Sequence, residues 1–302
     1  MSNILVSGLI NLEISLKVDS FPIGYTPVRF PFDGINSSVS GVGFNLAKAL
    51  TVLGNRIDFL SIIGKDQVSR LVIRALEDNF ISSRYIQNLM ETTAHSVILY
   101  DDSGRRMINT DLKNIQELVY PPELGDQALE RCPVAVLCNI NFSRPFLQKA
   151  QRMGKLIATD VHTISDIQDE YNRDFMAAAD ILFMSDEKLP CTPKEWIRRV
   201  LNTYGNEIIV IGMGTQGVLI SVKSDRFIEK ISAVKTRPVV NTIGAGDALF
   251  ACFLHYYVQN RDPYEAIRKA VVFASYKVGE ASAAEGFLSE IALEDLYYKI
   301  RQ

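Results

Sequence analysis

Short apolar runs alternate along the chain with longer stretches in which apolar residues recur at helical spacing. The runs are rich in Val, Ile and Leu and have the length of buried strands, whereas the longer stretches have the length of helices. This alternation predicts an α/β fold, in which helices cover both faces of a central, mostly parallel sheet. Strands are predicted at 3–9, 57–63, 134–140, 156–158, 181–184 and 208–211, helices at 121–131, 144–152, 169–179 and 194–204, and a helix followed by a short strand within 68–89.

Two segments, 12–37 and 95–112, do not fit this alternation. The first alternates only weakly and carries three prolines, which favour turns over core strands. In the second, apolar runs flank the turn-forming stretch Asp101–Gly104, a pattern typical of a β-hairpin. We therefore expect short strands outside the main core in both segments.

Polar residues gather where the predicted strands end. They are Asn11 and Glu13, Asn139 and Asn141, Asp160 and His162, and Ser185–Glu187. Ligands of open α/β sheets bind outside the carboxyl ends of the strands, so we expect these residues to line an enzyme cleft. Asn11 and Glu13 would point the same way, because alternate residues of a strand share a face.

Composition narrows the class of protein. The chain has 302 residues, of which 47% are apolar, and a net charge of −3. It therefore lacks the basic face that nucleic acid or an anionic membrane requires, and neither is expected as a partner. Four scattered cysteines without a C-x-x-C pair indicate reduced thiols. Without a signal-peptide pattern or an apolar run of about 18 residues, we expect a cytoplasmic protein with a single domain over 1–302.

The stretch Asn241–Asp247 carries the strongest chemical signal. Its Gly244–Gly246 turn precedes the apolar run 248–254, which has the character of a helix. If that helix begins near Ala245, its free N–H groups and positive dipole end form an anion site suited to phosphate oxygens. Asp247 would lie in the first turn, where the dipole favours its charged form. A carboxylate base would then lie beside a bound phosphate.

This stretch resembles the second signature of the PfkB (ribokinase-like) carbohydrate kinases, D-T-x-G-A-G-D, from which it departs at Asn241. The stretch 38–45 resembles the first signature of that family and is predicted to open a helix. Within it Gly41 and Asn45 match the family pattern, whereas Ser40 replaces a glycine.

The stretch Gly212–Gly217 satisfies G-x-G-x-x-G, the pattern of a dinucleotide-binding turn. That fingerprint requires a helix directly after it, whereas 218–222 is β-branched and predicts a strand. We therefore predict a strand–turn–strand hairpin. Gly214 and Gly217 resemble the G-x-x-G turn that lies near the nucleotide phosphates in the PfkB family. The chain has no P-loop, which excludes a P-loop kinase.

The resemblance implies a ribokinase-like fold with a small β-sheet lid, formed from about 12–37 and 95–112, over the substrate. It implies ATP-dependent phosphorylation of a primary hydroxyl, with Asp247 as the base and the N–H groups of Gly244, Ala245 and Gly246 holding the γ-phosphate. The residues implied for the acceptor pocket are Asn11, Glu13, Gly41, Asn45 and Asn141, and those implied for the nucleotide site are Thr242, Gly214 and Gly217.

The same resemblance implies that Mg²⁺ bridges the nucleotide phosphates. The metal-region motif of the family would fall near 184–188, where either Glu187 or Asp186 matches, depending on the alignment. Asn241 lacks the charge that often helps the family to bind a monovalent cation, which argues against activation by potassium.

Three functions stay open at this point. A sugar kinase is the first, because the family consists mostly of sugar kinases. A nucleoside kinase is the second: 41–45 is similar to a G-V-x-R-N form, and Phe44, which replaces the arginine, would either stack a base or pack in the core. A non-catalytic binding module is the third, but the intact Gly-Ala-Gly turn and Asp247 argue against it.

The resemblance also implies a homodimer in which two lids pack against each other. Apolar residues in the predicted hairpin, among them Val97, Leu99 and Ile108, are consistent with such a contact.

Overall fold

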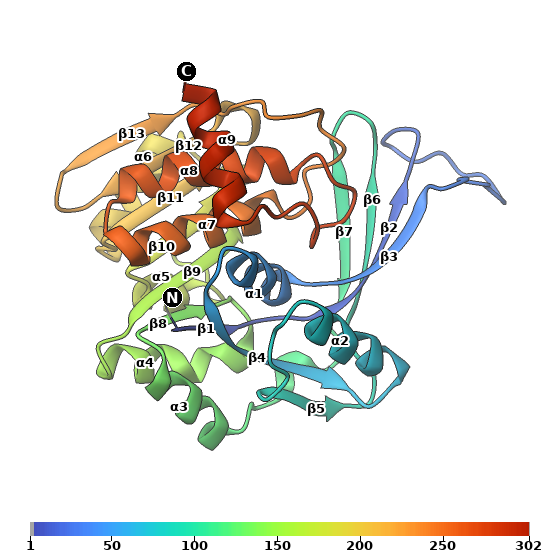
Figure 1. Ribbon diagram of the computed structural model, residues 1–302, viewed down its shortest axis with the longest axis horizontal. Coiled ribbons are helices and arrows are strands. Elements are labelled where there is room, and N and C mark those ends of the chain that lie inside the picture. The colour runs from blue at the N-terminus through green and yellow to red at the C-terminus, as the bar shows by residue number, and fades with distance from the viewer. Residues whose placement is uncertain (1–2, 302) are drawn as a thin grey trace.

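The computed structural model describes residues 3–301, and within them the chain forms one large and one smaller sheet (Figure 1). The large sheet has nine strands in the order β13-β12-β11-β10-β9-β8-β1-β4-β5. Neighbours from β11 to β5 run parallel, and β12 and β13 extend one edge antiparallel. The strands are β1 (Asn3–Ser7), β4 (Arg56–Gly64), β5 (Ile86–Met90), β8 (Val134–Leu137), β9 (Leu156–Thr163), β10 (Ile181–Ser185), β11 (Ile208–Gly212), β12 (Val218–Val222) and β13 (Phe227–Ile231).

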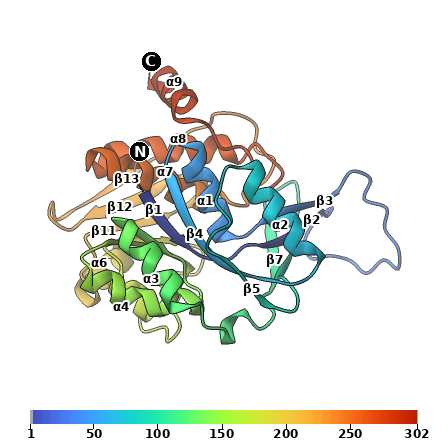
Figure 2. The same cartoon turned by 60° about the horizontal axis from the view of Figure 1, so that its bottom comes forward.

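Helices pack on both faces of this sheet (Figure 2). One face carries α1 (Val42–Val52), α2 (Gln67–Asp78), α7 (Ala245–Asn260), α8 (Pro263–Lys277) and α9 (Glu290–Arg301), and the other carries α3 (Pro122–Arg131), α4 (Arg144–Arg152), α5 (Arg173–Ala178) and α6 (Pro193–Thr203). Successive strand residues enter opposite cores: Ile4 and Val6 pack in one, and Leu5 packs in the other. The strands are therefore apolar on both faces, which confirms the predicted α/β fold.

Three strands end two or more residues away from where the sequence predicts. The strand predicted at 3–9 ends at Ser7, because the chain turns at Gly8, where it passes close to α1. The strand predicted at 134–140 ends at Leu137 and is followed by a short 3₁₀ turn, η2 (Asn141–Ser143). β9 continues beyond 158 to Thr163, because its pairing with β10 extends as far as Ser185.

Two predicted helix starts are wrong. The helix predicted at 169–179 begins at Arg173, because the Asp169 side chain accepts the Asn172 N–H over 2.8 Å and forms a turn instead. In the stretch 38–45, the first residues belong to a strand that pairs with Asn11 and Glu13, and α1 begins only at Val42. The hairpin predicted around 212–217 is confirmed, since β11 and β12 pair antiparallel across the 3₁₀ turn η3 (Gly214–Gln216).

The smaller sheet stands beside one end of the large sheet in Figure 1. Its order is β3-β2-β6-β7, with β2 and β6 parallel and the outer pairs antiparallel. Its strands are β2 (Asn11–Lys17), β3 (Ile35–Ser40), β6 (His95–Tyr100) and β7 (Arg106–Asp111). Because β2 follows β1 after a short turn, side chains at the start of β2 lie next to the carboxyl end of β1.

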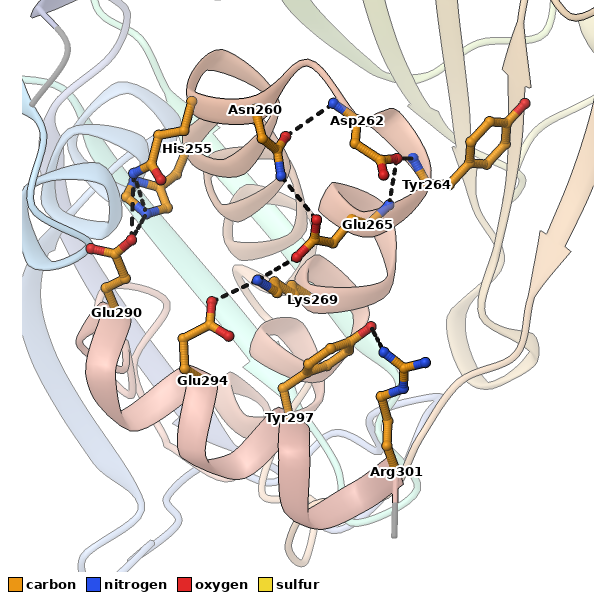
Figure 3. Close-up of polar contacts among 11 residues, drawn as sticks. His255, Asn260, Asp262, Tyr264, Glu265, Lys269, Glu290, Glu294, Tyr297 and Arg301 are labelled. Atoms are coloured by element: carbon orange, nitrogen blue, oxygen red, sulfur yellow. Dashed lines mark hydrogen bonds and ion pairs between the residues drawn. The ribbon is translucent and has the colours of Figure 1, made fainter.

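Charged contacts hold the C-terminal helix α9 against α7 and α8 (Figure 3). Lys269 of α8 lies 2.7 Å from Glu265 and 2.7 Å from Glu294 of α9. His255 Nε2 of α7 lies 3.3 Å from Glu290 Oε1 of α9. Both Lys269 and His255 are buried, so losing their partners would leave a buried polar group unpaired. These contacts fix α8, whose last turn reaches the candidate site. None of the helices within residues 3–301 is long and apolar enough to cross a membrane.

A contact between two glycines sets the position of α1. A Cβ added to Gly43 would lie 2.5 Å from the backbone carbonyl carbon of Gly8. Only a residue without a side chain lets α1 approach the end of β1 this closely. The contact places Asn45, one turn into α1, beside the start of α7.

We expect Gly43→Ala to lower the free energy of unfolding by about 1–3 kcal/mol, because its methyl group would force two backbone segments apart. Urea unfolding of the purified protein measures this change. Gly24→Ala is the matched control, since an added Cβ there meets nothing within 4 Å. Equal stability of the two variants would contradict the assigned role of the Gly8–Gly43 contact.

Candidate active site

Helix α7 begins at the Gly244–Gly246 turn. Its N-cap, Gly244, has φ 75°, and a Cβ there would lie 2.5 Å from the Ala283 carbonyl oxygen. Glycine is required by both the backbone conformation and the close approach. The sixteen-residue helix directs its first N–H groups and positive dipole end into the turn. The Ala245 N–H also bonds the Thr242 carbonyl over 3.3 Å, which closes the turn.

Asp247 lies in the first turn of α7 and is only 8% exposed. Its Oδ2 accepts a hydrogen bond of 2.7 Å from Asn45 Nδ2, and Asn45 Oδ1 accepts one of 3.2 Å from Ser40 Oγ. Burial raises the pKa of Asp247, and the bond from Asn45 and the charges of His162 and Lys277 oppose this rise. The arrangement leaves Oδ1 of a buried, oriented carboxylate at the dipole end of a helix.

The start of β2 brings Asn11 and Glu13 to the same region. Glu13 is 5% exposed, and burial raises its pKa, although the nearby Ser40 hydroxyl and the Ala283 backbone counteract this rise. Asn11 Nδ2 donates to Ser96 Oγ over 2.5 Å, whereas Asn11 Oδ1 is buried without a hydrogen-bond partner. An unpartnered buried acceptor is costly, so this oxygen is suited to a ligand hydroxyl.

Gly41 lies between β3 and α1 with φ 104°, and a Cβ there would lie 2.7 Å from the Leu9 carbonyl oxygen. This lets the chain turn tightly between Ser40 and Asn45, both of which belong to the Asp247 hydrogen-bond chain. Asn141 is placed differently. Its N–H and Nδ2 groups donate to Gln116, so it ties η2 to the segment before α3 and has no hydrogen bond to the Asp247 group within residues 3–301.

The residues implied for the nucleotide site occupy two places. Gly214 and Gly217 form the turn between β11 and β12, with φ 55° and 91°, and a Cβ at Gly217 would lie 2.0 Å from the Ile231 carbonyl oxygen. Thr242 lies just before Gly244, and its Oγ1 accepts a bond of 3.0 Å from Arg106 Nη1 of β7.

Arg106 also pairs with Glu187, whose Oε1 lies 3.1 Å from Nη2. The two residues line a cavity of about 410 Å³ together with Phe21, Gly104, Arg105 and Met107. Glu187 is thus engaged by an arginine, and residues 3–301 contain no group of three or more His, Cys, Asp or Glu that could hold a metal ion.

Lys277 is a site residue that sequence reasoning missed. It ends α8, is fully buried, and its Nζ donates to the Ile243 carbonyl, directly before Gly244. Burial lowers its pKa to about 8. In the sequence, a lysine at the end of a helix is the ordinary partner of the helix dipole, so no signal distinguishes it. Arg106 was missed for a related reason, because its contacts join segments far apart in the chain.

Comparison with known proteins identifies the family of this chain. A model of the pfkB family of carbohydrate kinases matches residues 1–290. The deoxyribokinase of Salmonella typhi is 26% identical over 79% of this chain and 80% of its own length. The structure of a microbiome-derived acarbose kinase, Mak1, superposes with a TM-score of 0.88 at 26% identity and covers 98% of this chain and 99% of that one.

A nucleoside kinase from Methanocaldococcus jannaschii shares the fold, with a TM-score of 0.78 at 19% identity over 99% of both chains. The family match spans nearly the whole chain and includes the turn, the base candidate and both sheets. The chain therefore belongs to the pfkB family of carbohydrate kinases and is a phosphotransferase.

Proposed function

We propose that this protein transfers the γ-phosphate of ATP to a primary hydroxyl of a small sugar, with Asp247 as the general base. The observation that carries the proposal is the Ser40–Asn45–Asp247 hydrogen-bond chain at the start of α7. It fixes a buried carboxylate where the dipole of α7 attracts phosphate oxygens. Sequence similarity to a deoxyribokinase and an acarbose kinase supports a sugar acceptor.

In the proposed step, the acceptor hydroxyl oxygen bonds to the γ-phosphorus, and the bond from that phosphorus to the bridging oxygen of ADP breaks. The hydroxyl proton moves to Asp247. Asn45 already occupies Oδ2, which leaves Oδ1 to receive the proton. N–H groups of Gly244 and Gly246, joined by that of Ala245 once it leaves the Thr242 carbonyl, hold the transferring phosphoryl oxygens, whose charge is spread in the transition state.

The remaining groups bind and orient the two substrates. Thr242, Gly214 and Gly217 lie on the nucleotide side, with Mg²⁺ carried by the phosphates. The unpartnered Asn11 Oδ1 and the buried Glu13 carboxylate receive hydroxyl groups of the acceptor. The smaller sheet acts as a lid above them, since it supplies these two residues from one strand.

One observation favours a sugar over a nucleoside. Phe44, which would have to stack a base, is 1% exposed and packs in the hydrophobic core with α7. The polar groups at the start of β2 suit hydroxyls better than an aromatic ring. A nucleoside kinase is the second candidate, supported by the shared fold of nucleoside kinases.

We expect Asp247→Asn to lower turnover by about 10²–10⁴-fold, because the amide cannot accept the hydroxyl proton. The amide keeps the size of the carboxylate, so ATP affinity, measured by calorimetry, should change little. ATP consumption is measured first with the wild-type enzyme against sugars, sugar phosphates and nucleosides, and then with the variant. Asp78→Asn, an exposed position on α2, is the control. Wild-type turnover by Asp247→Asn would exclude Asp247 as the base.

We further propose that two copies associate through their lids. Apolar side chains on one face of the smaller sheet are partly solvent-exposed, including Ile35, Val97 and Met107 at 41–59%. Exposed apolar side chains that share a face are suited to a contact between proteins.

Light scattering at micromolar concentration should therefore report a dimer, and Val97→Glu should shift it to a monomer by placing a charge in the contact. Ile291→Glu changes an equally apolar, exposed residue on α9 and should leave the dimer intact. A monomeric wild-type protein would contradict the proposal.

A further inference from the structure

A buried lysine lies directly behind the turn that would hold the phosphate. Lys277 has no exposed surface, and its ammonium group bonds the Ile243 carbonyl, one residue before Gly244. A lysine is rarely buried in this way unless its charge has a use or a partner. Its contact with the backbone of the turn places a positive charge on the inner side of the proposed anion site.

The groups around Lys277 show how this charge is balanced. Asp247 of α7, Glu13 of β2 and Glu280 beyond α8 attract it, and Arg237 repels it. The influence is mutual, because Lys277 lowers the pKa of both Asp247 and Glu13. One ammonium group therefore counters the cost of burying two carboxylates that the proposed reaction uses.

The same place does not fit an alkali-metal ion. Such an ion would need several free oxygen ligands, but three oxygens near Asn241 already accept hydrogen bonds. Ile243 O accepts from Lys277, Ala281 O accepts from Asn241 Nδ2 at 2.5 Å, and Asn241 Oδ1 accepts from the Ile243 N–H at 3.0 Å. Asn241 is neutral as well as buried, so it adds no negative charge to attract a cation. A metal cation here would also lie beside the ammonium group and be repelled by it.

We propose that the Lys277 ammonium group is the built-in cation of the phosphoryl-transfer site, where it replaces a free monovalent ion behind the anion turn and keeps Asp247 ionised. Lys277 acts through the turn and through Asp247 without touching the substrate, so it is a positioning residue. The inference rests on the proposed role of Asp247 as the base.

The physical basis is the low polarity of the interior. A charge shielded from water acts over several ångströms on the negative charge that develops during transfer. A lysine delivers that charge at a fixed place, whereas a free ion must first be bound from solution. The prediction is an enzyme whose rate and stability do not depend on the kind of monovalent cation present.

The first test is independent of turnover. Thermal unfolding is followed in potassium, sodium and tetramethylammonium chloride at equal ionic strength. The wild-type protein should unfold at the same temperature in all three salts. Lys277→Ala, which leaves a space beside two buried carboxylates, should unfold at a lower temperature and recover part of the loss in potassium, but not in tetramethylammonium. Specific stabilisation of the wild type by potassium would overturn the proposal, and so would a folded Lys277→Ala variant that is indifferent to all cations.

Lys277→Met keeps most of the length of the side chain without its charge, and it serves if Lys277→Ala does not fold. The lysine has a pKa of about 8 in the folded protein and 10.5 as its ordinary value. Between these values the unfolded chain binds more protons at this residue, so its contribution to stability rises with pH. The stability difference between the wild type and Lys277→Met should therefore shift in favour of the wild type as the pH increases through this range. A difference that is independent of pH would contradict the buried position of the charge.

The second test uses the acceptor that the wild-type enzyme phosphorylates. Lys277→Met should reduce kcat by about 10–100-fold, somewhat less than the loss of a direct oxyanion donor. The pH at which kcat falls on the acid side should be higher for Lys277→Met than for the wild type, because Asp247 loses a neighbouring positive charge. The wild-type kcat should decline above about pH 8, where Lys277 loses its proton, and this decline should be absent in Lys277→Met.

If Lys277→Met lowered kcat by the same factor at every pH, Lys277 would have only a structural role, and the inference would be overturned. Absence of wild-type turnover with every acceptor would count against the proposed function, whereas the unfolding test still decides the role of Lys277.

Discussion

The site depends on one hydrogen bond, from Asn45 of α1 to Asp247 of α7, between residues 202 positions apart. This hydrogen bond requires that the positions of α1 and α7 be fixed closely relative to each other. Helix α1 is placed by the contact of Gly43 with Gly8, and α7 is placed by the left-handed turn at Gly244 against Ala283. Both helices pack on the same face of the large sheet, which therefore supports them both.

Burial of Asp247 creates the electrostatic problem that this arrangement solves. A carboxylate shielded from water tends to take up a proton, and a protonated group cannot act as a base. The dipole of α7, the amide of Asn45 and the charge of Lys277 act against that tendency from three directions. Under the proposed function, dry surroundings would be combined with an ionised carboxylate, which is the condition under which electrostatic stabilisation of a transition state is strongest.

The sequence was sufficient for features that local chemistry determines. The alternation of strands and helices is written in short-range periodicity, and the start of α7 follows from glycines ahead of an apolar run. The hairpin after Gly212 could be told from a dinucleotide-binding turn because the β-branched residues follow at once. Errors arose at element ends, as at Asp169, where a side chain captured a backbone N–H and delayed the helix.

Features that depend on distant packing were not visible in the sequence. Phe44 could not be assigned to the core or to a ligand until the position of α1 was known. The engagement of Asn141 by Gln116, the bridge from Arg106 to Thr242 and Glu187, and the burial of Lys277 all join separate elements. Periodicity reports which face of an element is apolar, but it does not report which residue of another element lies opposite.

The Asn45–Asp247 contact joins an early segment of the chain to a late one. This has a consequence for synthesis on the ribosome. The strands of the central sheet from β1 to β11 are translated before α7 and α8, and they can begin to pair while the C-terminal quarter is still being made. Glu13 and Asn45 are therefore made well before Asp247 and Lys277. A nascent or truncated chain without α8 can hold most of its sheet without a complete candidate site, so the proposed phosphate transfer requires that synthesis has passed α8.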